Sequence, residues 1–474
     1  MSGVVAAGHP LTAEAGAEVL REGGNAVDAA VCAALASFAV ESPLTGFGAG
    51  GFMMVHRGGE TTLLDFFVAA PGKDGIERAA ELVPVPVHFD AETVQTFYVG
   101  PVSCGAPGTA AGLEEALRRF GTVPLAELVK PGARLAREGA PVNAEQAYIL
   151  DILEPIHARL EGTRELYAPA GRTLREGETF RFAALAEALE RFGAEGAEPF
   201  CRGEVAAALS EFVVEHGGTL GPEDLAAYET IEREPIRTSF RGTEVLTNPP
   251  PSSGGTLIAY CLGMLERLGE SSGPEQLVEA MGAANDARGD LLGSTTHISV
   301  LDRDGMCANV TCSNGSGSGV LVPGTGVILN NMLGEEDLNP LGFHAIPPGR
   351  RVTSMMAPTV VLREGEIEMG LGSAGSNRIR SAILQTIVRA VEQGMGAREA
   401  VQAPRLHFEQ GVVQAEPGID EAALARIEAR GIPVLRRPEI NLFFGGTQAV
   451  AREHGSGALS GGGDPRRGGS VAVA

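Results

Sequence analysis

Two helices separated by a glycine pair are predicted at the start of the chain. Thr12 can cap the first helix, which extends to about Glu22 and ends at the Gly-Gly pair that follows. Asn25 can cap the second helix, with Asp28 three residues later as in a capping box. Residues 26–40 are apolar nearly all round the helix, which predicts a position buried between layers.

Alternating polar and apolar residues around short turns predict three β-hairpins. Their expected strands are 52–56 with 61–67, 296–301 with 306–311, and 358–362 with 367–371. Helical apolar spacing dominates 108–227 and recurs at 256–268 and 377–393, whereas the glycine-rich stretch 455–469 predicts a loop. Without a repeat or a separating linker, this order predicts one layered α+β body over residues 1–474.

The composition argues against some classes of partner. The chain has 474 residues, enough for a large core. Its 37 basic and 60 acidic residues give a net charge of -23, which argues against binding to nucleic acid or to an anionic membrane. The 65 glycines are spread along the chain, which indicates many tight turns rather than a disordered linker.

The six cysteines have no metal-ligand spacing, and most stand among apolar neighbours. We therefore expect buried free thiols, which suit a reducing compartment. The N-terminal segment has no basic region followed by a long apolar run, and no stretch of about 18 apolar residues occurs. These patterns predict a cytoplasmic protein, and they imply no metal and no cofactor.

A candidate nucleophile stands at the start of the strand predicted after residue 295. Residues 289–293 have the composition of an exposed loop, and the alternating segment 294–302 follows. A self-cut at this junction would leave Thr295 as a new N-terminal residue. Its free amine, with a pKa of roughly 7.7–8.0, can take the proton from the hydroxyl. The plain alternative is an ordinary strand threonine, and we interpret His297 as structural.

Three further groups of residues offer chemistry near such a nucleophile. Segment 370–379 joins a strand to a helix, where backbone N–H groups can form an oxyanion hole, although such loops are commonly structural. Thr353 and Ser354 offer hydroxyls that can bind a carboxylate or simply serve a turn. Ser313 would approach Thr295 if the second hairpin pairs in register, and is otherwise a turn serine.

Taken together and in this order, these segments resemble the gamma-glutamyltranspeptidase family over nearly the whole chain. The segments that carry the resemblance are 23–30, 50–53, 105–109, 249–255, 295–297, 329–332, 354–358, 372–379 and 464–466. The resemblance implies the four-layer αββα fold of N-terminal-nucleophile hydrolases. It also implies self-cleavage between Ser294 and Thr295 into a large subunit, 1–294, and a small subunit, 295–474.

The resemblance also assigns catalytic roles. It makes Thr295 the nucleophile, with its freed α-amine as the base, and it makes Ser313 the residue that supports the nucleophile. The backbone N–H groups of Gly375 and Ser376 match the oxyanion-hole pair of the family, in which the second residue is usually glycine. A serine at the second position keeps its backbone N–H, so it can still donate a hydrogen bond to the oxyanion.

Substrate recognition is where the chain departs from the family. Thr353 and Ser354 match the hydroxyl pair that binds the substrate α-carboxylate. The family has an Arg that pairs with the same carboxylate, and Phe67 replaces it here. Each charged hydrogen bond of such a pair contributes about 1.5–3 kcal/mol. The acyl-transfer groups need no Arg, so the chemistry is expected to survive while affinity for a γ-glutamyl group falls.

The binding of the substrate α-amino group is also altered. The family has an Asp shortly after an Asn-Asn pair, and Gly334 follows that pair here instead. Glu335, Glu336 or Asp337 can substitute for it. The segment between 333 and 353 is shorter than in many members, so a lid over the site is expected to be reduced or missing.

Three hypotheses follow. The first is a self-processing threonine amidohydrolase that cleaves γ-glutamyl amides such as glutathione and passes the acyl group to water or an amine. The second keeps this chemistry but uses another acyl group, as in the related cephalosporin acylases. The third is an uncut, inactive binding protein. The first two imply a small-molecule or peptide acyl-amide substrate and two subunits from one chain, for which a dimer of the pair is one assembly.

Overall fold

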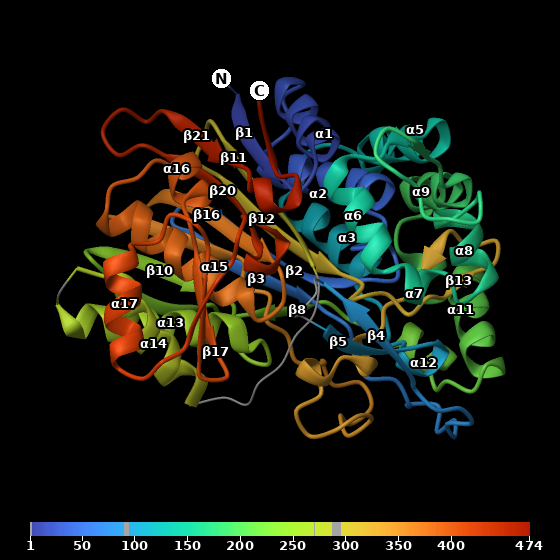
Figure 1. The fold of residues 1–474 in the computed structure, drawn as a ribbon. Coiled ribbons are helices and arrows are strands. Elements are labelled where there is room, and N and C mark those ends of the chain that lie inside the picture. The colour runs from blue at the N-terminus through green and yellow to red at the C-terminus, as the bar shows by residue number, and fades with distance from the viewer. Residues whose placement is uncertain (1, 90–93, 270, 287–294) are drawn as a thin grey trace.

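Two antiparallel β-sheets are stacked face to face in the molecule (Figure 1). The structure is a computed structural model that describes residues 2–89, 94–269, 271–286 and 295–474. In spatial order, the first sheet contains β22 (Ser470–Val473), β1 (Gly3–Ala7), β11 (Thr296–Asp302), β12 (Cys307–Ser313), β2 (Gly50–Arg57), β3 (Glu60–Phe66) and β8 (Ile231–Arg233). The second contains β21 (Leu459–Gly462), β20 (Gly446–Arg452), β16 (Glu366–Ala374), β15 (Thr359–Arg363), β10 (Thr243–Thr247) and β9 (Ile236–Phe240).

Helices pack on the outer face of each sheet. Those on the first sheet are α1 (Pro10–Arg21), α2 (Ala26–Val40) and α3 (Thr109–Phe120), and those on the second are α13 (Ser253–Leu268), α15 (Arg378–Ile387) and α16 (Ala397–Gln402). β11 and β12 contact β16 across the interface between the sheets. The predicted α+β class, with mixed helices and sheets, is therefore confirmed.

Smaller elements surround this framework. The remaining helices are α4 (Leu125–Leu128), α5 (Lys130–Glu138), α6 (Ala144–Ile152), α7 (Glu154–His157), α8 (Glu161–Tyr167), α9 (Ala183–Glu195), α10 (Glu198–Cys201), α11 (Glu204–Glu215), α12 (Pro222–Ala226), α14 (Pro274–Asp286) and α17 (Glu421–Ala429). The short strand groups are β4 (Val83–His88) with β5 (Val94–Val99), β6 (Ala140–Pro141) with β7 (Thr179–Phe180), β13 (Leu321–Val322) with β14 (Val327–Ile328), and β17 (Leu406–Glu409) with β18 (Val412–Ala415) and β19 (Val434–Arg436). None of the helices described is both long and apolar enough to cross a bilayer.

Strand alternation explains the two main apolar cores. Along β2, Met53 and Val55 belong to the core beneath α1 and α2, whereas Phe52 and Met54 belong to the core between the sheets. Successive side chains of a strand point to opposite faces, so a strand covered on both faces is apolar throughout. The fold thus buries the central strands from both sides.

The predicted second helix is confirmed with its bounds and its cap. α2 spans Ala26–Val40, and all of its residues are buried. Asn25 accepts hydrogen bonds from the Val27 and Asp28 N–H groups, while the Asp28 side chain accepts from the Asn25 N–H. The three predicted hairpins also form, with strand ends shifted by at most three residues.

Two local predictions are wrong. The first helix is capped by His9, whose Nδ1 accepts from the Leu11 N–H at 3.1 Å, because Pro10 starts the helix and leaves Thr12 inside it. The glycine-rich stretch 455–469 contains β21, which pairs with β20 at the sheet edge. The glycines are needed there, since a β-carbon at Gly462 would lie 2.5 Å from the Ala397 carbonyl oxygen.

Candidate active site

Thr295 lies immediately before β11 and is 4 % exposed. In the next residue pair along the ladder, Thr296 stands opposite Cys312. Continuing this antiparallel register by one step places Thr295 opposite Ser313. The two residues line one small cavity, which confirms the predicted approach of Ser313 to Thr295.

This nucleophile cavity has a volume of about 20 Å³, roughly the space of one water molecule. Its walls combine apolar side chains with a few polar groups. The lining residues are Phe67, Thr295, Ser313, Met332, Glu335, Asp337, Leu338, Ser354, Met355, Met356, Ser376 and Ile379. The structure thus brings together seven candidates from the sequence, whereas Thr353, Glu336 and Gly375 do not line the cavity.

The two hydroxyls of the Thr353–Ser354 pair have different surroundings. Thr353 Oγ1 donates to the Leu338 carbonyl oxygen at 2.9 Å. Ser354 is buried and its Oγ accepts from the Met356 N–H at 3.0 Å, which leaves the Ser354 proton available in the cavity. Of the pair, Ser354 is therefore the better placed to meet a substrate.

The turn between β16 and α15 requires unusual backbone angles. Gly375 has φ = 115°, and a β-carbon there would lie 2.6 Å from Gly445 Cα. Ser376 has φ = 60°, in the left-handed region that costs a non-glycine residue roughly 1–2 kcal/mol. This geometry gives a physical reason why glycine is the usual residue at the second position of the turn.

Phe67 forms an apolar wall of the nucleophile cavity. It is fully buried and stacks on Phe52, with ring centroids 5.5 Å apart. The neighbouring Asp65 carboxylate is turned away to Arg233 Nε at 2.6 Å and Arg351 Nε at 3.1 Å. Both arginines are thereby held by an internal carboxylate, so neither takes over the position of the missing family Arg.

Two carboxyl groups from the segment after the Asn-Asn pair line the same cavity as Thr295. Glu335 and Asp337 are both buried and both line the cavity. Burial, with the charge of Asp337 as a second cause, raises the pKa of Glu335 well above its ordinary value, although Glu335 Oε1 accepts from the Ser316 N–H at 2.7 Å. A substrate ammonium placed here would offset the cost of this buried acidic pair.

Glu41 is a site residue that the sequence analysis missed. It follows α2 directly and is 1 % exposed. Its carboxyl group accepts from Thr296 Oγ1 at 2.6 Å and from Thr12 Oγ1 at 2.8 Å. Burial raises the pKa of Glu41, while these two hydrogen bonds and the charge of Arg467 oppose the rise. An acidic residue directly after a helix that is apolar from Ala29 to Val40 except for Ser37 was the available signal.

His297 links the two strands of the nucleophile hairpin. Its Nδ1 is 2.7 Å from Thr311 Oγ1, and its Nε2 is 2.9 Å from Ser299 Oγ. Burial lowers its pKa to about 3, so the ring is neutral. These contacts agree with the structural interpretation of this histidine.

The six cysteines are free thiols, five of them buried and Cys201 partly buried. Burial raises the pKa of Cys307 and of Cys312, on the nucleophile hairpin, to about 12, so neither is a thiolate at neutral pH. Within the described ranges, no group of three or more His, Cys, Asp or Glu side chains is arranged to hold a metal ion.

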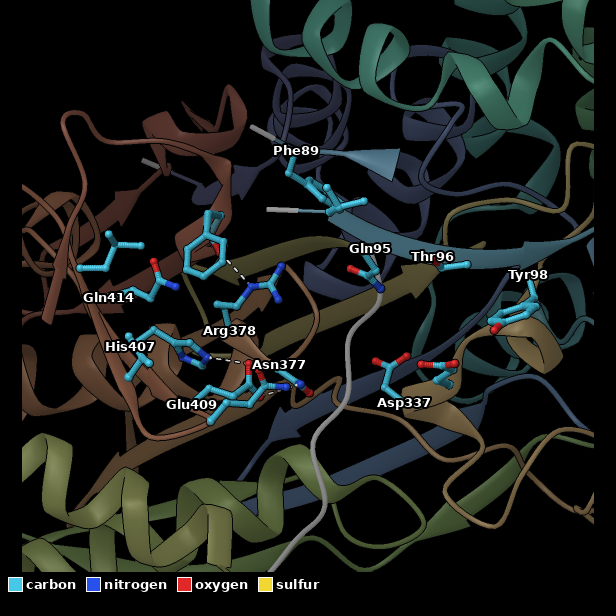
Figure 2. A pocket seen from close by; sticks show the side chains of 16 residues that line it. Phe89, Gln95, Thr96, Tyr98, Asp337, Asn377, Arg378, His407, Glu409 and Gln414 are labelled. Carbon is cyan, nitrogen blue, oxygen red and sulfur yellow. Dashed lines mark hydrogen bonds and ion pairs between the residues drawn. The ribbon is translucent and has the colours of Figure 1, made fainter. Parts of the chain in front are cut away.

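Figure 2 shows a second, larger cavity. Its volume is about 810 Å³, and it lies among β5, β17, β18 and the start of α15. Asp337 lines both cavities. The chain from Ser376 to Ile379 separates them, because its two ends line the nucleophile cavity and its two middle residues line the larger one.

Comparisons with known proteins agree with this geometry. The family model described as gamma-glutamyltranspeptidase matches residues 12–294 and 290–474. The chain is 33% identical to the Acylase ACY 1 proenzyme of Pseudomonas sp. (strain SE83), covering 95% of this chain and 89% of that protein. It is 31% identical to the glutathione hydrolase proenzyme of Escherichia coli (strain K12), covering 98% and 90%.

Solved structures show the same similarity. A cephalosporin acylase from Bacillus halodurans superimposes with a TM-score of 0.87 at 26% identity, covering 100% of this chain and 96% of that one. The gamma-glutamyltranspeptidase of Helicobacter pylori superimposes with a TM-score of 0.52 at 31% identity, covering 59% and 80%.

Proposed function

The chain belongs to the gamma-glutamyltranspeptidase family of enzymes, and on that premise we propose that it is a self-processing threonine amidohydrolase with Thr295 as its nucleophile. The observation that carries the proposal is the placement of Thr295 and Ser313 in one buried cavity that the Ser376 turn also lines. Self-cleavage between Ser294 and Thr295 would yield subunits 1–294 and 295–474. Ser294 itself lies outside the described residues.

The packing of two helix layers on two sheets supports the four-layer αββα arrangement of N-terminal-nucleophile hydrolases as the framework of this chemistry. In that arrangement both subunits stay in one body, because β11 pairs with β1 on one side and β12 pairs with β2 on the other. We further propose a dimer of the two-subunit protein. We also propose a cytoplasmic location, which the free thiols favour.

In the first half of the reaction, the α-amine of Thr295 takes the proton from Oγ1, and Oγ1 attacks the amide carbon. The backbone N–H groups of Gly375 and Ser376 stabilise the oxyanion that forms. The C–N bond then breaks, and the proton held by the α-amine goes to the leaving amine. Ser313 Oγ accepts from the Gly315 N–H at 2.8 Å, so its own proton can be donated to Thr295 Oγ1.

In the second half, water or an amine loses a proton to the α-amine and attacks the ester on Thr295 Oγ1. The acyl group leaves as an acid or a new amide, and Oγ1 recovers its proton. We propose γ-glutamyl amides such as glutathione as the substrate class. In this proposal Glu335 and Asp337 receive the α-ammonium and Ser354 receives the α-carboxylate, which is supported by the position of all three in the lining of the nucleophile cavity.

A different acyl group is the second candidate, and Phe67 favours it. The Phe67 ring stands where the family has an Arg, so an α-carboxylate on the acyl chain finds no cation to pair with at this position. Turnover of γ-glutamyl-p-nitroanilide should be compared with that of glutaryl-p-nitroanilide. A clear preference for the glutaryl compound would show that the substrate class is other acyl amides and not γ-glutamyl amides.

The test of the nucleophile is the intact mass of the purified protein under denaturing conditions. We expect two chains separated between Ser294 and Thr295, and a Thr295→Ala variant that stays one chain. Two chains from that variant would show that the cleavage site is elsewhere. A wild-type chain that stays uncut after long incubation would favour the third hypothesis, an inactive binding protein.

A further inference from the structure

Arg467 is a buried cation that packs against the turn between β16 and α15. It is 9 % exposed and ends the short helical turn Pro465–Arg467 near the C-terminus. Its stem packs on Gly446 at the start of β20, where a β-carbon would lie 2.5 Å from Arg467 Cδ. Its guanidinium packs on Gly375, where a β-carbon would lie 3.4 Å from Arg467 Nη2. The two glycines thus leave the space that this side chain occupies.

The charges that act on Arg467 come from three places in the fold. Glu41 follows α2, Asp464 precedes the same helical turn, and Arg378 begins α15. Both acids make their direct contacts with other groups, Glu41 with two threonine hydroxyls and Asp464 with two other arginines at 2.6 and 3.1 Å. Among the described residues Arg467 forms no ion pair, and its Nε has no hydrogen-bond partner. No single carboxylate therefore holds this guanidinium.

Arg467 acts on the surroundings of the nucleophile from two sides. On one side its charge acts on Glu41, the acid that accepts from the residue next to the nucleophile. On the other side it contacts Gly375, and the next residue of that turn lines the nucleophile cavity. A positive charge stabilises a nearby oxyanion and disfavours the protonated form of a nearby amine. An ionised Glu41 has the opposite effect on both groups, and Arg467 offsets it.

We propose that Arg467 is a positioning residue for acyl transfer, which holds the Gly375 turn in place and supplies a positive charge that favours both the oxyanion and a neutral α-amine on Thr295. Arg467 is not among the described residues that line the nucleophile cavity. It therefore acts through the turn and through the field of its charge, without touching the substrate. This inference rests on the proposed acyl transfer at Thr295.

The pH dependence of kcat/KM tests the charge of Arg467, with the better of the two p-nitroanilides as substrate. The acidic limb of the wild-type profile reports the α-amine, which must be neutral to act as the base. Arg467→Met keeps the stem without the charge, so this limb should move up by about one pH unit. At pH 7, kcat should fall roughly 10- to 100-fold, because the oxyanion loses the same charge. Glu335 and Asp337 also line the cavity, but they are present in every variant.

Arg389→Met is the matched control. Arg389 is 8 % exposed, and its Nη2 donates to the Pro404 carbonyl oxygen. The charges that act on it belong to Arg405, Arg466, Glu416 and Asp464. The acidic limb should not move in this variant. Arg467→Lys keeps the charge and should hold the limb near its wild-type position. If Arg467→Met does not fold, Arg467→Gln takes its place in the comparison.

A cavity beside Arg467 allows chemical rescue of the missing charge. Arg467 lines a cavity of about 520 Å³ together with Phe89, Glu145 and Phe443. In Arg467→Gly, a guanidinium ion can enter from this cavity and take the place of the side chain. Low millimolar guanidinium should raise kcat/KM of this variant roughly 10-fold and move its acidic limb back toward the wild-type position. Urea has a similar shape without the charge and should do neither. An equal effect of urea would show that Arg467 only fills space, and would overturn the proposal.

Labelling of the α-amine separates the charge from the chemistry. The rate at which acetic anhydride modifies the N-terminal amine of the small subunit, followed by intact mass against pH, reports the pKa of that amine without turnover. If Arg467→Met raises this pKa while wild type turns over neither p-nitroanilide, the proposed acyl transfer fails and the placement of the charge stands. If wild type is active and Arg467→Met has the same acidic limb and the same amine pKa, acyl transfer stands and the inference is overturned. An uncut wild-type chain has no free α-amine at Thr295 and overturns both.

Discussion

Thr296 Oγ1 donates a hydrogen bond of 2.6 Å to Glu41 Oε2, and this bond fixes the residue next to the nucleophile to the end of α2. Strand alternation turns Thr296 toward the helices and Thr295 toward the opposite face. A β-carbon at Gly8 would lie 2.5 Å from Glu41 Oε2, so Gly8 leaves the space that the carboxyl group occupies. We infer that Glu41 positions the strand whose first residue must react.

Thr296→Val tests this positioning role. The substitution keeps the shape of the side chain but leaves Glu41 Oε2 without its donor, so unfolding in urea should show a loss of about 1–3 kcal/mol. Self-cleavage, followed by intact mass over time, should slow as well. Thr12→Val is the control, because it removes the bond to Glu41 Oε1 at a residue distant in sequence from the cut. A Thr296→Val variant that cuts itself as fast as the wild type would rule out positioning by Glu41.

Ser376→Gly should relieve the left-handed backbone of the turn. Relative to Ser376→Ala, which keeps φ = 60° with a β-carbon, the glycine variant should be about 1 kcal/mol more stable. Both variants lose the hydroxyl, so their difference isolates the backbone term. Activity should persist in both, because the proposed donor is the backbone N–H. Loss of activity in both would mean that the Ser376 hydroxyl takes part.

Phe67→Ala should enlarge the nucleophile cavity. Because Phe67 is fully buried, truncation should cost about 3–5 kcal/mol in unfolding experiments. Its neighbour Phe66 is equally buried but lies in the other core, so Phe66→Ala should cost a similar amount. Turnover of bulky relative to small acyl p-nitroanilides should rise in Phe67→Ala alone. An equal rise in this turnover ratio in both variants would mean that general loosening of the fold, and not the wall of the cavity, causes the rise.

The raised pKa of Glu335 predicts a pH-dependent stability. The folded state holds a proton that the unfolded state releases above its pKa of about 4.3, so this residue lowers stability as the pH rises from that value through its folded pKa. Glu335→Gln removes the effect, and its stability advantage over wild type should grow between pH 5 and pH 8 in urea unfolding.

Glu336→Gln is the matched control for this pH series. The Glu336 side chain is exposed, so the substitution should change stability by less than about 0.5 kcal/mol at either pH. A difference between Glu335→Gln and wild type that stays constant with pH would show that Glu335 is ionised in the folded protein throughout this range.

Short-range patterns predicted much of the fold. The helix 26–40 and its capping box follow from residues within one helical turn of each other, and the hairpins follow from alternation around a turn. The edge strand β21 escaped prediction, because its glycines form a strand only by pairing with β20. The cap at His9 was missed since more than one polar residue near Pro10 can cap a helix.

The sequence by itself also determined the chemical candidates: a threonine opening a strand, a serine opposite it in the hairpin register, and a glycine turn before a helix. Only the tertiary structure decided which groups surround them. Glu41 is 255 residues from Thr296, and Arg378 reaches a cavity whose opposite wall comes from β5. Such contacts arise when layers pack, because burial of apolar faces sets which distant side chains meet, and no local pattern records that.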